Sequence, residues 1–170
     1  MTTVCRKSFD PGFKIRRATA EDLLSIAALE EECGLNSRGA EGHRKRLTNP
    51  KAILLAAVRD QSDSTDRKTI GMFSGEVVMD ELQVDNLAVS QSYRRKGVGR
   101  MLLQSALSYA HCLGARTSLL EVAVANLPAR TFYEREGFVV IALRKSYYTD
   151  PIDDALLLAR EIDSGTGIVY

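Results

Sequence analysis

The chain carries the sequence NLAVSQSYRRKGVGR at residues 86–100, where an apolar strand pattern runs into a glycine-bearing turn and then into a helix. Gly97 and Gly99 remove β-carbons at the point where backbone could approach a ligand closely. A turn that enters a helix directs free N–H groups and the positive end of the helix dipole at an anion. The segment therefore predicts a pyrophosphate site at the start of a long helix.

Four cationic side chains surround this turn: Arg94, Arg95, Lys96 and Arg100. They favour phosphate locally, although the whole chain has a formal charge of only +1. A Walker loop needs Gly-Lys followed by Ser or Thr, whereas Lys96 precedes its glycine. A dinucleotide fingerprint needs three glycines and an acidic residue at the end of the next strand, and neither is present. The alternative for two glycines alone is a helix start with a solvated basic face.

Length and composition indicate one globular domain. The chain has 170 residues, 45% of them hydrophobic and 26% charged, so it can build a core and lacks the signature of disorder. We expect one domain over residues 1–170, with its core at about 14–160 and a flexible tail at about 163–170. The balanced charge and the absence of an 18-residue apolar run predict a soluble, cytoplasmic protein, monomer or dimer, that binds neither nucleic acid nor membrane.

The cysteines and histidines do not suggest a metal centre. Cys5, Cys33 and Cys112 are odd in number and lie far apart, which fits neither a disulfide framework nor paired zinc ligands. His43 and His111 are the only imidazoles. We therefore expect reduced thiols and no bound metal.

Hydrophobic periodicity predicts the order strand, two helices, three strands, helix, strand, helix, two strands. The expected strands lie at 13–17, 52–58, 69–79, 82–89, 118–125, 138–143 and 155–160, the expected helices at 19–32, 37–47, 97–113 and 126–136, and a polar hairpin tip at 61–68. This pattern is typical of an α/β fold with a mixed, mainly antiparallel central sheet flanked by about four helices.

The motif Arg94-x-x-Gly97-x-Gly99, placed after Asn86-Leu87-Ala88-Val89, resembles the acetyl-CoA signature of the GNAT superfamily of N-acetyltransferases. The likeness extends from about residue 14 to residue 160, and it is strongest to the bacterial ribosomal-protein N-terminal alanine acetyltransferases. Similar residues stand at Asp80-Glu81, Leu120-Glu121-Val122, Asn126, Phe132-Tyr133-Glu134, Gly137-Phe138 and Tyr147-Tyr148. The expected fold is therefore GNAT-like.

This resemblance implies that acetyl-CoA is the co-substrate. It implies that backbone at residues 87–89 bonds the pantetheine arm, that residues 95–100 bind the diphosphate, and that Asn126 contacts the cofactor from the second half of the fold. The full cofactor-binding set is Leu87, Ala88, Val89, Arg94, Arg95, Lys96, Gly97, Val98, Gly99, Arg100 and Asn126. A main-chain N–H at residues 87–89 is expected to hold the carbonyl oxygen where this strand splays from its neighbour.

Glu121 is the candidate general base. It is the only charged residue in the apolar stretch 118–125, where partial desolvation of a carboxyl group raises its pKa and makes it a better proton acceptor near neutral pH. The alternative is a carboxylate at an exposed or salt-bridged strand position. The resemblance favours the catalytic interpretation.

Tyr133 is the candidate acid. It lies 12 residues beyond Glu121, on the following helix, where the resemblance places the tyrosine that protonates the coenzyme A thiolate. A phenol with a pKa near 10 is protonated beforehand. The alternative is an amphipathic aromatic half buried beside Phe132. We expect direct transfer without an acetyl-enzyme, because Cys112 and His111 are neighbours on a helix and do not face each other.

The acceptor is expected to be a protein N-terminus, such as that of a ribosomal protein. An α-amino group titrates about 2.5 units below lysine, so one carboxylate deprotonates it more easily. Tyr147 and Tyr148 are expected to grip the first residues of the peptide, with cross-strand packing as the alternative. The resemblance places residues 33–39 along the acceptor side, although this segment lacks the aromatic and proline residues that are common there. The alternatives are an acetyltransferase for lysine or a small-molecule amine, a non-catalytic CoA-binding module and, least favoured, a nucleic-acid-binding domain.

Overall fold

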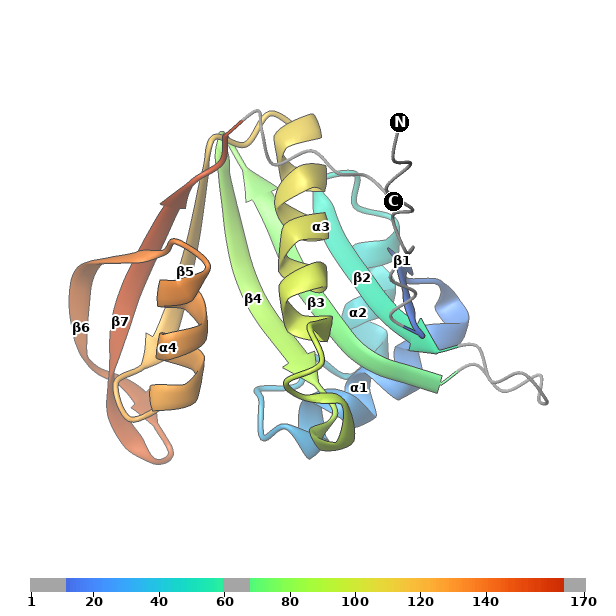
Figure 1. The fold of residues 1–170 in the computed structure, drawn as a ribbon, viewed down its shortest axis with the longest axis horizontal. Coiled ribbons are helices and arrows are strands. Elements are labelled where there is room, and N and C mark those ends of the chain that lie inside the picture. The colour runs from blue at the N-terminus through green and yellow to red at the C-terminus, as the bar shows by residue number, and fades with distance from the viewer. Residues whose placement is uncertain (1–11, 60–67, 164–170) are drawn as a thin grey trace, which may run out of the picture.

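One seven-stranded sheet runs through the molecule in the order β1-β2-β3-β4-β5-β7-β6, with helices on both faces (Figure 1). The computed structural model describes residues 12–59 and 68–163. The strands are β1 (Lys14–Arg17), β2 (Ala52–Arg59), β3 (Lys68–Val78), β4 (Glu81–Val89), β5 (Thr117–Ala123), β6 (Val139–Thr149) and β7 (Ile152–Glu161). The α-helices are α1 (Leu23–Glu32), α2 (Gly39–Leu47), α3 (Val98–Cys112) and α4 (Leu127–Arg135), and 3₁₀ turns occupy Ala20–Asp22 and Gln91–Tyr93.

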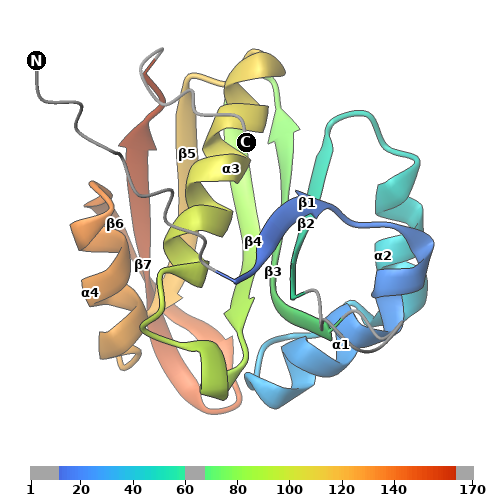
Figure 2. The same ribbon diagram turned by 45° about the vertical axis from the view of Figure 1, so that its right-hand side comes forward.

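Strands β2 and β3 are covered on both faces. Side chains alternate along β2, so Ile53 and Leu55 join the cluster beneath α3 while Leu54 and Ala56 join the cluster beneath α1. Figure 2 shows α1 and α2 together on one side of these strands and α3 on the other. Burial on both faces explains why β2 reads as an uninterrupted apolar run rather than an alternating one.

Strands β5, β7 and β6 form a second half with less cover. On β5 the residues Ser118, Leu120 and Val122 are buried and those between them are half-buried, so only one face packs against the helices. Nearly every residue of β6 is exposed, which is expected of a strand at the sheet edge. Helix α4 packs beside this half (Figure 1).

The two halves meet at the only parallel strand pair among the described residues. Strands β4 and β5 pair only at Glu81–Thr117, Leu82–Ser118 and Gln83–Leu119 and then diverge, which confirms the expected splay (Figure 1). Asp85 is the extra residue of a bulge in β4, because Ser74 faces Asn86 while Gly75 faces Val84. The bulge bends β4 at the point where it leaves β5.

The predicted element order and fold class are confirmed, but several boundaries are wrong. Helix α2 begins at Gly39 rather than Ser37, because Ser37 donates its hydroxyl hydrogen to the Glu30 carboxylate instead of continuing the helix. Asn126 caps α4 from outside, and the first helix is preceded by a 3₁₀ turn. The strand expected at 118–125 ends at Ala123, where the chain turns towards α4.

The last two strands are longer than predicted and hold Tyr147 and Tyr148 within β6 rather than in the hairpin loop. Register shifts at Ile141 and across residues 145–147 let the strand continue through the charged stretch that ended the apolar pattern. Most of the predicted hairpin tip at 61–68 and of the tail at 163–170 lies outside the described residues. None of the described helices is long and apolar enough to cross a membrane.

Candidate active site

The turn before α3 has the backbone geometry that its glycines predict. Gly97 is the N-cap of α3 with φ 85°, and Arg95 also has a positive φ of 62°. A β-carbon on Gly97 would meet no atom within 4 Å, so glycine is needed there for its backbone angle and not for space. A β-carbon on Gly99 would lie 3.6 Å from Val89 and 3.7 Å from Phe132, which is ordinary contact. The first N–H groups of α3 have no acceptor within the helix and are free to bind an anion.

The cations around this turn divide into two groups. Arg94 folds back on the strand, since its Nε donates to the carbonyl oxygen of Val89 at 3.0 Å. Arg100 is exposed and lies 3.5 Å from Glu136, and Arg95 is exposed. Arg94 therefore ties the turn to the end of β4, whereas Arg95 and Arg100 are available to a ligand at the surface.

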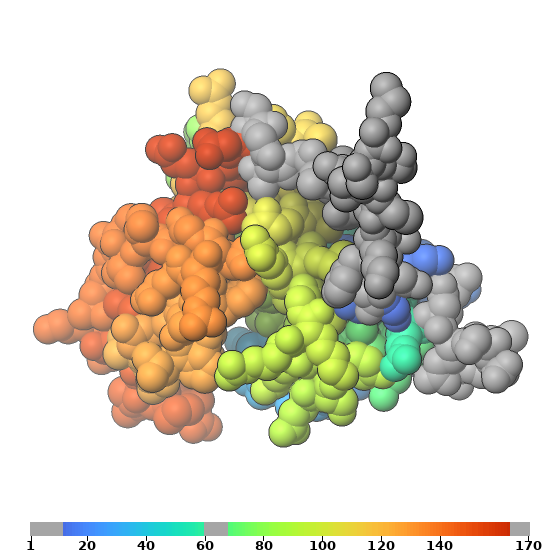
Figure 3. Space-filling model, viewed as in Figure 1, coloured from blue at the N-terminus to red at the C-terminus, as the bar shows by residue number. Residues whose placement is uncertain are grey.

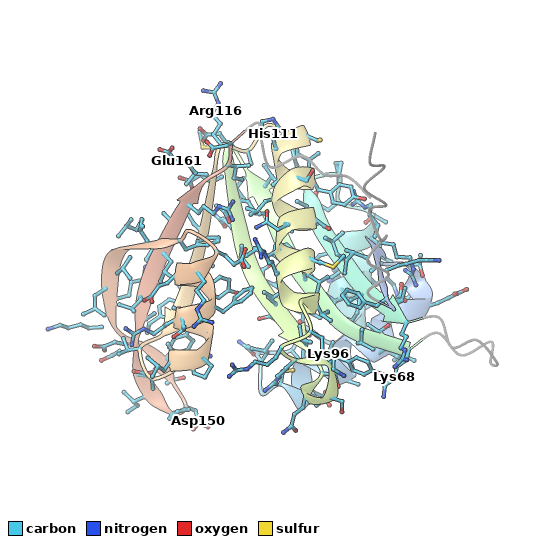
Figure 4. All side chains as sticks on the ribbon, viewed as in Figure 1. Lys68, Lys96, His111, Arg116, Asp150 and Glu161 are labelled. Atoms are coloured by element: carbon cyan, nitrogen blue, oxygen red, sulfur yellow. The ribbon has the colours of Figure 1, made fainter. Side chains whose placement is uncertain are left out.

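Three cationic side chains lie close to the ring of Tyr93, beside the same turn. The hydrogen bond from Arg59 to its hydroxyl lowers the pKa of Tyr93, and the charges of Arg59, Lys68 and Lys96 lower it further. The Lys96 ammonium lies 5.2 Å from the ring centroid. Figure 4 shows Lys68 and Lys96 at the same end of the molecule, by the start of α3. The turn thus lies in a locally positive field, as the sequence predicts.

Glu121 projects from the face of β5 opposite the core. Its neighbours Leu120 and Val122 are buried in the cluster that also holds residues of α3. The carboxylate Oε1 accepts a hydrogen bond from Nη1 of Arg144 at 2.9 Å, and the Glu121 side chain is 28% exposed. The structure therefore shows the salt-bridged strand position that the sequence left open as the alternative, and the role of Glu121 as general base stays a prediction.

Tyr133 projects from α4 into the core on the other face of the sheet. Its ring packs edge-on against Phe132 and Phe138 at centroid distances of 5.1 and 5.5 Å. Burial raises the pKa of Tyr133 well above 10, and the nearby Tyr148 raises it further. The phenol is thus protonated throughout the neutral range, as an acid catalyst requires.

Tyr148 links these two groups. Burial raises the pKa of Tyr148 first, and the charges of Tyr147, Glu121 and Asp153 add to the effect. Tyr148 is half-buried, and its ring packs edge-on against Tyr147 at 5.1 Å. Glu121 and Tyr133 therefore lie on opposite sides of β5 with Tyr148 in electrostatic reach of both. The contact between the two tyrosines is one between neighbours on β6, whereas the residue opposite Tyr148 on β7 is Asp153.

Asn126 has a local structural partner. Its Oδ1 accepts the backbone N–H of Ala129 at 3.2 Å, and Pro128 follows in the first turn of α4. This N-cap explains the residue without a cofactor. Its predicted contact with the cofactor stays a prediction.

Sequence reasoning missed the partner of Glu121 and a buried polar cluster beneath β4. Arg144 lies in a charged stretch that looked like a solvated strand end. Glu30 and His43 are both fully buried and face each other at 3.0 Å. Glu30 stands in a run of three glutamates that suggests a solvated helix end, although its position four residues after the buried Ile26 places it on the apolar side of α1.

Figure 3 shows a hollow between α4 and the start of α3, on the face where the glycine-bearing turn lies. Within residues 12–59 and 68–163, no group of three or more His, Cys, Asp and Glu side chains is arranged to hold a metal ion.

Comparison with known proteins places this chain among the acetyltransferases. The model of the acetyltransferase (GNAT) family matches residues 21–138. The Escherichia coli K12 ribosomal protein bS18-alanine N-acetyltransferase is 38% identical over 89 residues, which are 51% of this chain and 60% of that protein. This chain thus spans about 60% of the length of that curated relative.

Solved structures agree over a longer range. The crystal structure of the E. coli ribosomal-protein-S18-alanine N-acetyltransferase has a TM-score of 0.75 and 25% identity, covering 93% of this chain and 99% of that one. The Arabidopsis thaliana protein NAA60 in complex with acetyl-CoA has a TM-score of 0.77 at 18% identity, covering 88% of this chain and 99% of that one, and this similarity concerns the fold alone.

Proposed function

The chain belongs to the acetyltransferase (GNAT) family, and from that premise we propose that it transfers the acetyl group of acetyl-CoA to the N-terminal α-amino group of a protein. A ribosomal protein is the favoured acceptor, because the E. coli relative is named for that substrate. The observation that carries the proposal is the arrangement at the splay. The glycine-bearing turn adjoins the end of β4 that β5 does not pair with, and Glu121 and Tyr133 flank the strand that parts from it.

The donor's diphosphate would be held by the backbone N–H groups at the start of α3, with Arg95 and Arg100 at the surface beside them. Residues 87–89 of β4 have no partner on β5, so, apart from the Val89 carbonyl oxygen that accepts from Arg94, their backbone groups on that side would bond an extended pantetheine arm. Acetyl-CoA supplies the activated thioester carbonyl. A main-chain N–H of residues 87–89 would stabilise the negative charge that develops on the carbonyl oxygen.

Glu121 would remove the proton from the attacking amine, directly or through water. A neutral nitrogen lone pair is then free to form the C–N bond while the C–S bond breaks. Arg144 would orient the Glu121 carboxylate through the 2.9 Å hydrogen bond to its Oε1. Tyr133 would give its hydroxyl proton to the departing thiolate and regain one afterwards, so the proton taken by Glu121 and the proton given by Tyr133 balance.

The α-amino group fits a single carboxylate base better than lysine does. It titrates near 7.7 to 8.0, so a substantial share is already neutral at physiological pH, whereas lysine at about 10.4 needs further deprotonation. Tyr147 and Tyr148 would contact the first residues of the peptide from the end of β6. The cytoplasmic location expected from the sequence remains a prediction.

Mass spectrometry on matched peptides tests this proposal. One peptide begins with a free alanine and contains an internal lysine, and its partner has the same sequence with a blocked N-terminus. The protein should acetylate the first at its α-amine and leave the second unmodified. Equal labelling of both peptides would assign the activity to lysine, and failure to release CoA with any amine would favour the non-catalytic binding module.

A further inference from the structure

A carboxylate without solvent contact lies beneath the splay. Glu30, in the last turn of α1, is 0% exposed. Its Oε1 accepts a hydrogen bond from Nδ2 of Asn86 at 2.7 Å. Its Oε2 accepts from the Ser37 hydroxyl at 2.9 Å and the Arg38 N–H at 3.3 Å, and faces Nε2 of His43 at 3.0 Å. A buried charge is costly unless it is hydrogen-bonded, and this one has four donors.

The donors keep Glu30 ionised in spite of its burial. Burial alone raises the pKa of Glu30, but the hydrogen bonds from His43, Asn86 and Ser37 together bring it below its ordinary value. Because a carboxylate only accepts, Nε2 of His43 carries the hydrogen that points at it. Nδ1 of His43 is buried without a hydrogen-bond partner among the described residues.

Asn86 connects this cluster to the site. It follows the bulge residue Asp85 and precedes residues 87–89, which lack a partner on β5. Its Nδ2 donates both to Glu30 and to the carbonyl oxygen of Asn36 at 3.2 Å. One amide group therefore fixes β4, just beyond its bend, both to α1 through Glu30 and to the chain between α1 and α2 through Asn36.

The α1–α2 segment (residues 33–38) runs along the unpaired part of β4. Sγ of Cys33 lies 3.6 Å from the carbonyl oxygen of Val89, and Asn36 contacts Asn86 at the other end. Ser37 and Arg38 close the segment onto Glu30. The segment thus forms a wall beside the splay whose position depends on the Glu30 cluster.

We propose that Glu30 is a positioning residue for the acceptor: through Asn86 and Ser37 it holds the α1–α2 segment against the bent part of β4, and so sets the wall along which the incoming amine lies. This inference rests on the proposed function, which places the acceptor at the splay. It assigns to Glu30 no contact with either substrate. The expected effect of loosening the cluster is therefore on acceptor binding and not on the donor.

Asn86→Ala tests the link, with Asn49→Ala as a matched control. Asn49 also donates its side-chain amide to a glutamate, Glu76, at 2.8 Å, but it does so between α2 and β2, away from the splay. Ser37→Ala is a milder second variant that removes one donor from Glu30. Hydrogen–deuterium exchange of residues 33–38 reports on the wall without any activity. Kinetics with the best acceptor peptide and calorimetry with acetyl-CoA report on the two substrates.

Asn86→Ala and Ser37→Ala should speed exchange in residues 33–38 and raise the acceptor KM, about tenfold for Asn86→Ala, a change of about 1.4 kcal/mol. The acetyl-CoA Kd should stay within about twofold, and Asn49→Ala should change neither exchange in the segment nor KM. Unchanged exchange or an unchanged acceptor KM in both splay variants overturns the proposal, as does an equal rise in KM for Asn49→Ala.

The same experiment separates this inference from the proposed function. If the wild-type protein acetylates lysine instead of an α-amine, the acceptor proposed above is wrong, and the KM comparison is made with the lysine peptide. A selective rise in that KM still supports Glu30 as a positioning residue. If the protein acetylates no amine, unchanged exchange in residues 33–38 of both variants overturns the inference by itself.

Discussion

The two halves of the sheet differ in how firmly they are held. Strands β2 and β3 are packed on both faces, and seven of the eight residues of β2 are buried. In β6, by contrast, ten of eleven residues are exposed. Strand pairing between the two halves is limited to three residue pairs of β4 and β5. The well-packed half carries the glycine-bearing turn, and the open half carries Glu121, Tyr133, Tyr147 and Tyr148.

This difference suggests a division of labour. Binding the donor needs fixed backbone groups, and the half with two covered faces can hold them in place. Receiving a variable peptide needs exposed side chains, and the thinly covered half provides them. A substitution in one half should therefore affect the binding of one substrate or one step of the reaction and leave the other unchanged.

The largest effect should come from removing the proton-transfer groups of the open half. Glu121→Gln and Tyr133→Phe should each lower kcat by about 100-fold or more, because each loses the group that takes or gives a proton. The Kd of acetyl-CoA, set by the packed half, should stay within about twofold. Steady-state kinetics and calorimetry measure both quantities. Glu134→Gln and Tyr109→Phe are controls that change the same residue types elsewhere.

The pH profile sharpens the role of Tyr133. Since burial raises its pKa above 10, the phenol stays protonated as the pH rises from 6 to 9, and it should contribute no descending limb to kcat in that range. A descending limb that disappears in Tyr133→Phe would contradict this assignment. So would wild-type turnover in both Glu121→Gln and Tyr133→Phe.

The next effect should come from the turn in the packed half. Gly97→Ala places a β-carbon on a residue with φ 85°, which costs about 1–2 kcal/mol and should raise the acetyl-CoA Kd about tenfold. Gly99→Ala has room for its methyl group and should raise Kd less than about threefold. Calorimetry compares the two variants. Equal losses of affinity would mean that close approach of the ligand, not backbone angle, explains both glycines.

A smaller effect is expected at the hairpin end of the open half. Tyr147 is 47% exposed, packs edge-on against Tyr148 and has the Arg144 guanidinium 5.7 Å from its ring centroid. Tyr147→Ala should raise the acceptor KM about threefold to fivefold, corresponding to about 1 kcal/mol, with kcat for a saturating peptide nearly unchanged. Peptide titrations at fixed acetyl-CoA measure this. A change confined to the KM of acetyl-CoA would remove Tyr147 from the acceptor side.

The smallest effect concerns stability and its dependence on pH. Burial alone raises the pKa of Asp22, but the hydrogen bonds from Arg16 and Thr19 and the charge of Arg16 lower it below 3.8. A lowered folded-state pKa contributes stability that is present above the unfolded value and is lost as the pH falls through the folded value. Asp22→Asn should therefore cost about 1 kcal/mol at pH 7.

Thermal unfolding between pH 7 and pH 3 checks this prediction, with the exposed neighbour Glu21→Gln as the control. The Tm deficit of Asp22→Asn should be a few degrees at pH 7, on the scale expected for a chain of this size, and should shrink below about pH 4. A deficit that grows in acid would show that Asp22 is not held as a carboxylate.

Local patterns predict the fold well where one element decides its own structure. The apolar run of β2 and the glycines around α3 can be interpreted without knowing which elements pack against them. The hydrophobic periodicity of the rest of the chain gives the correct element order. The length of β6 could not be predicted, because Arg144 finds its partner Glu121 on β5 and not within its own strand. Charged residues there read as the end of a strand.

The candidate site shows the same limit. Glycines of the turn are recognisable because backbone geometry is local, and Glu121 is recognisable as a lone charge in an apolar strand. Glu30 and His43 are 13 residues apart on different helices, and only the packing of α1 on α2 brings them together. Asn86 is another 43 residues further on, so nothing in the local sequence indicates that it meets Glu30.

A crystal structure with bound acetyl-CoA tests the central claim most directly, namely that the packed half holds the donor and presents its thioester at the splay. In this complex we expect the diphosphate oxygens within hydrogen-bonding distance of the N–H groups of residues 95–100, and the thioester between residues 87–89 and Tyr133. Density for the donor elsewhere, with that turn unaltered and unbound, would contradict the account.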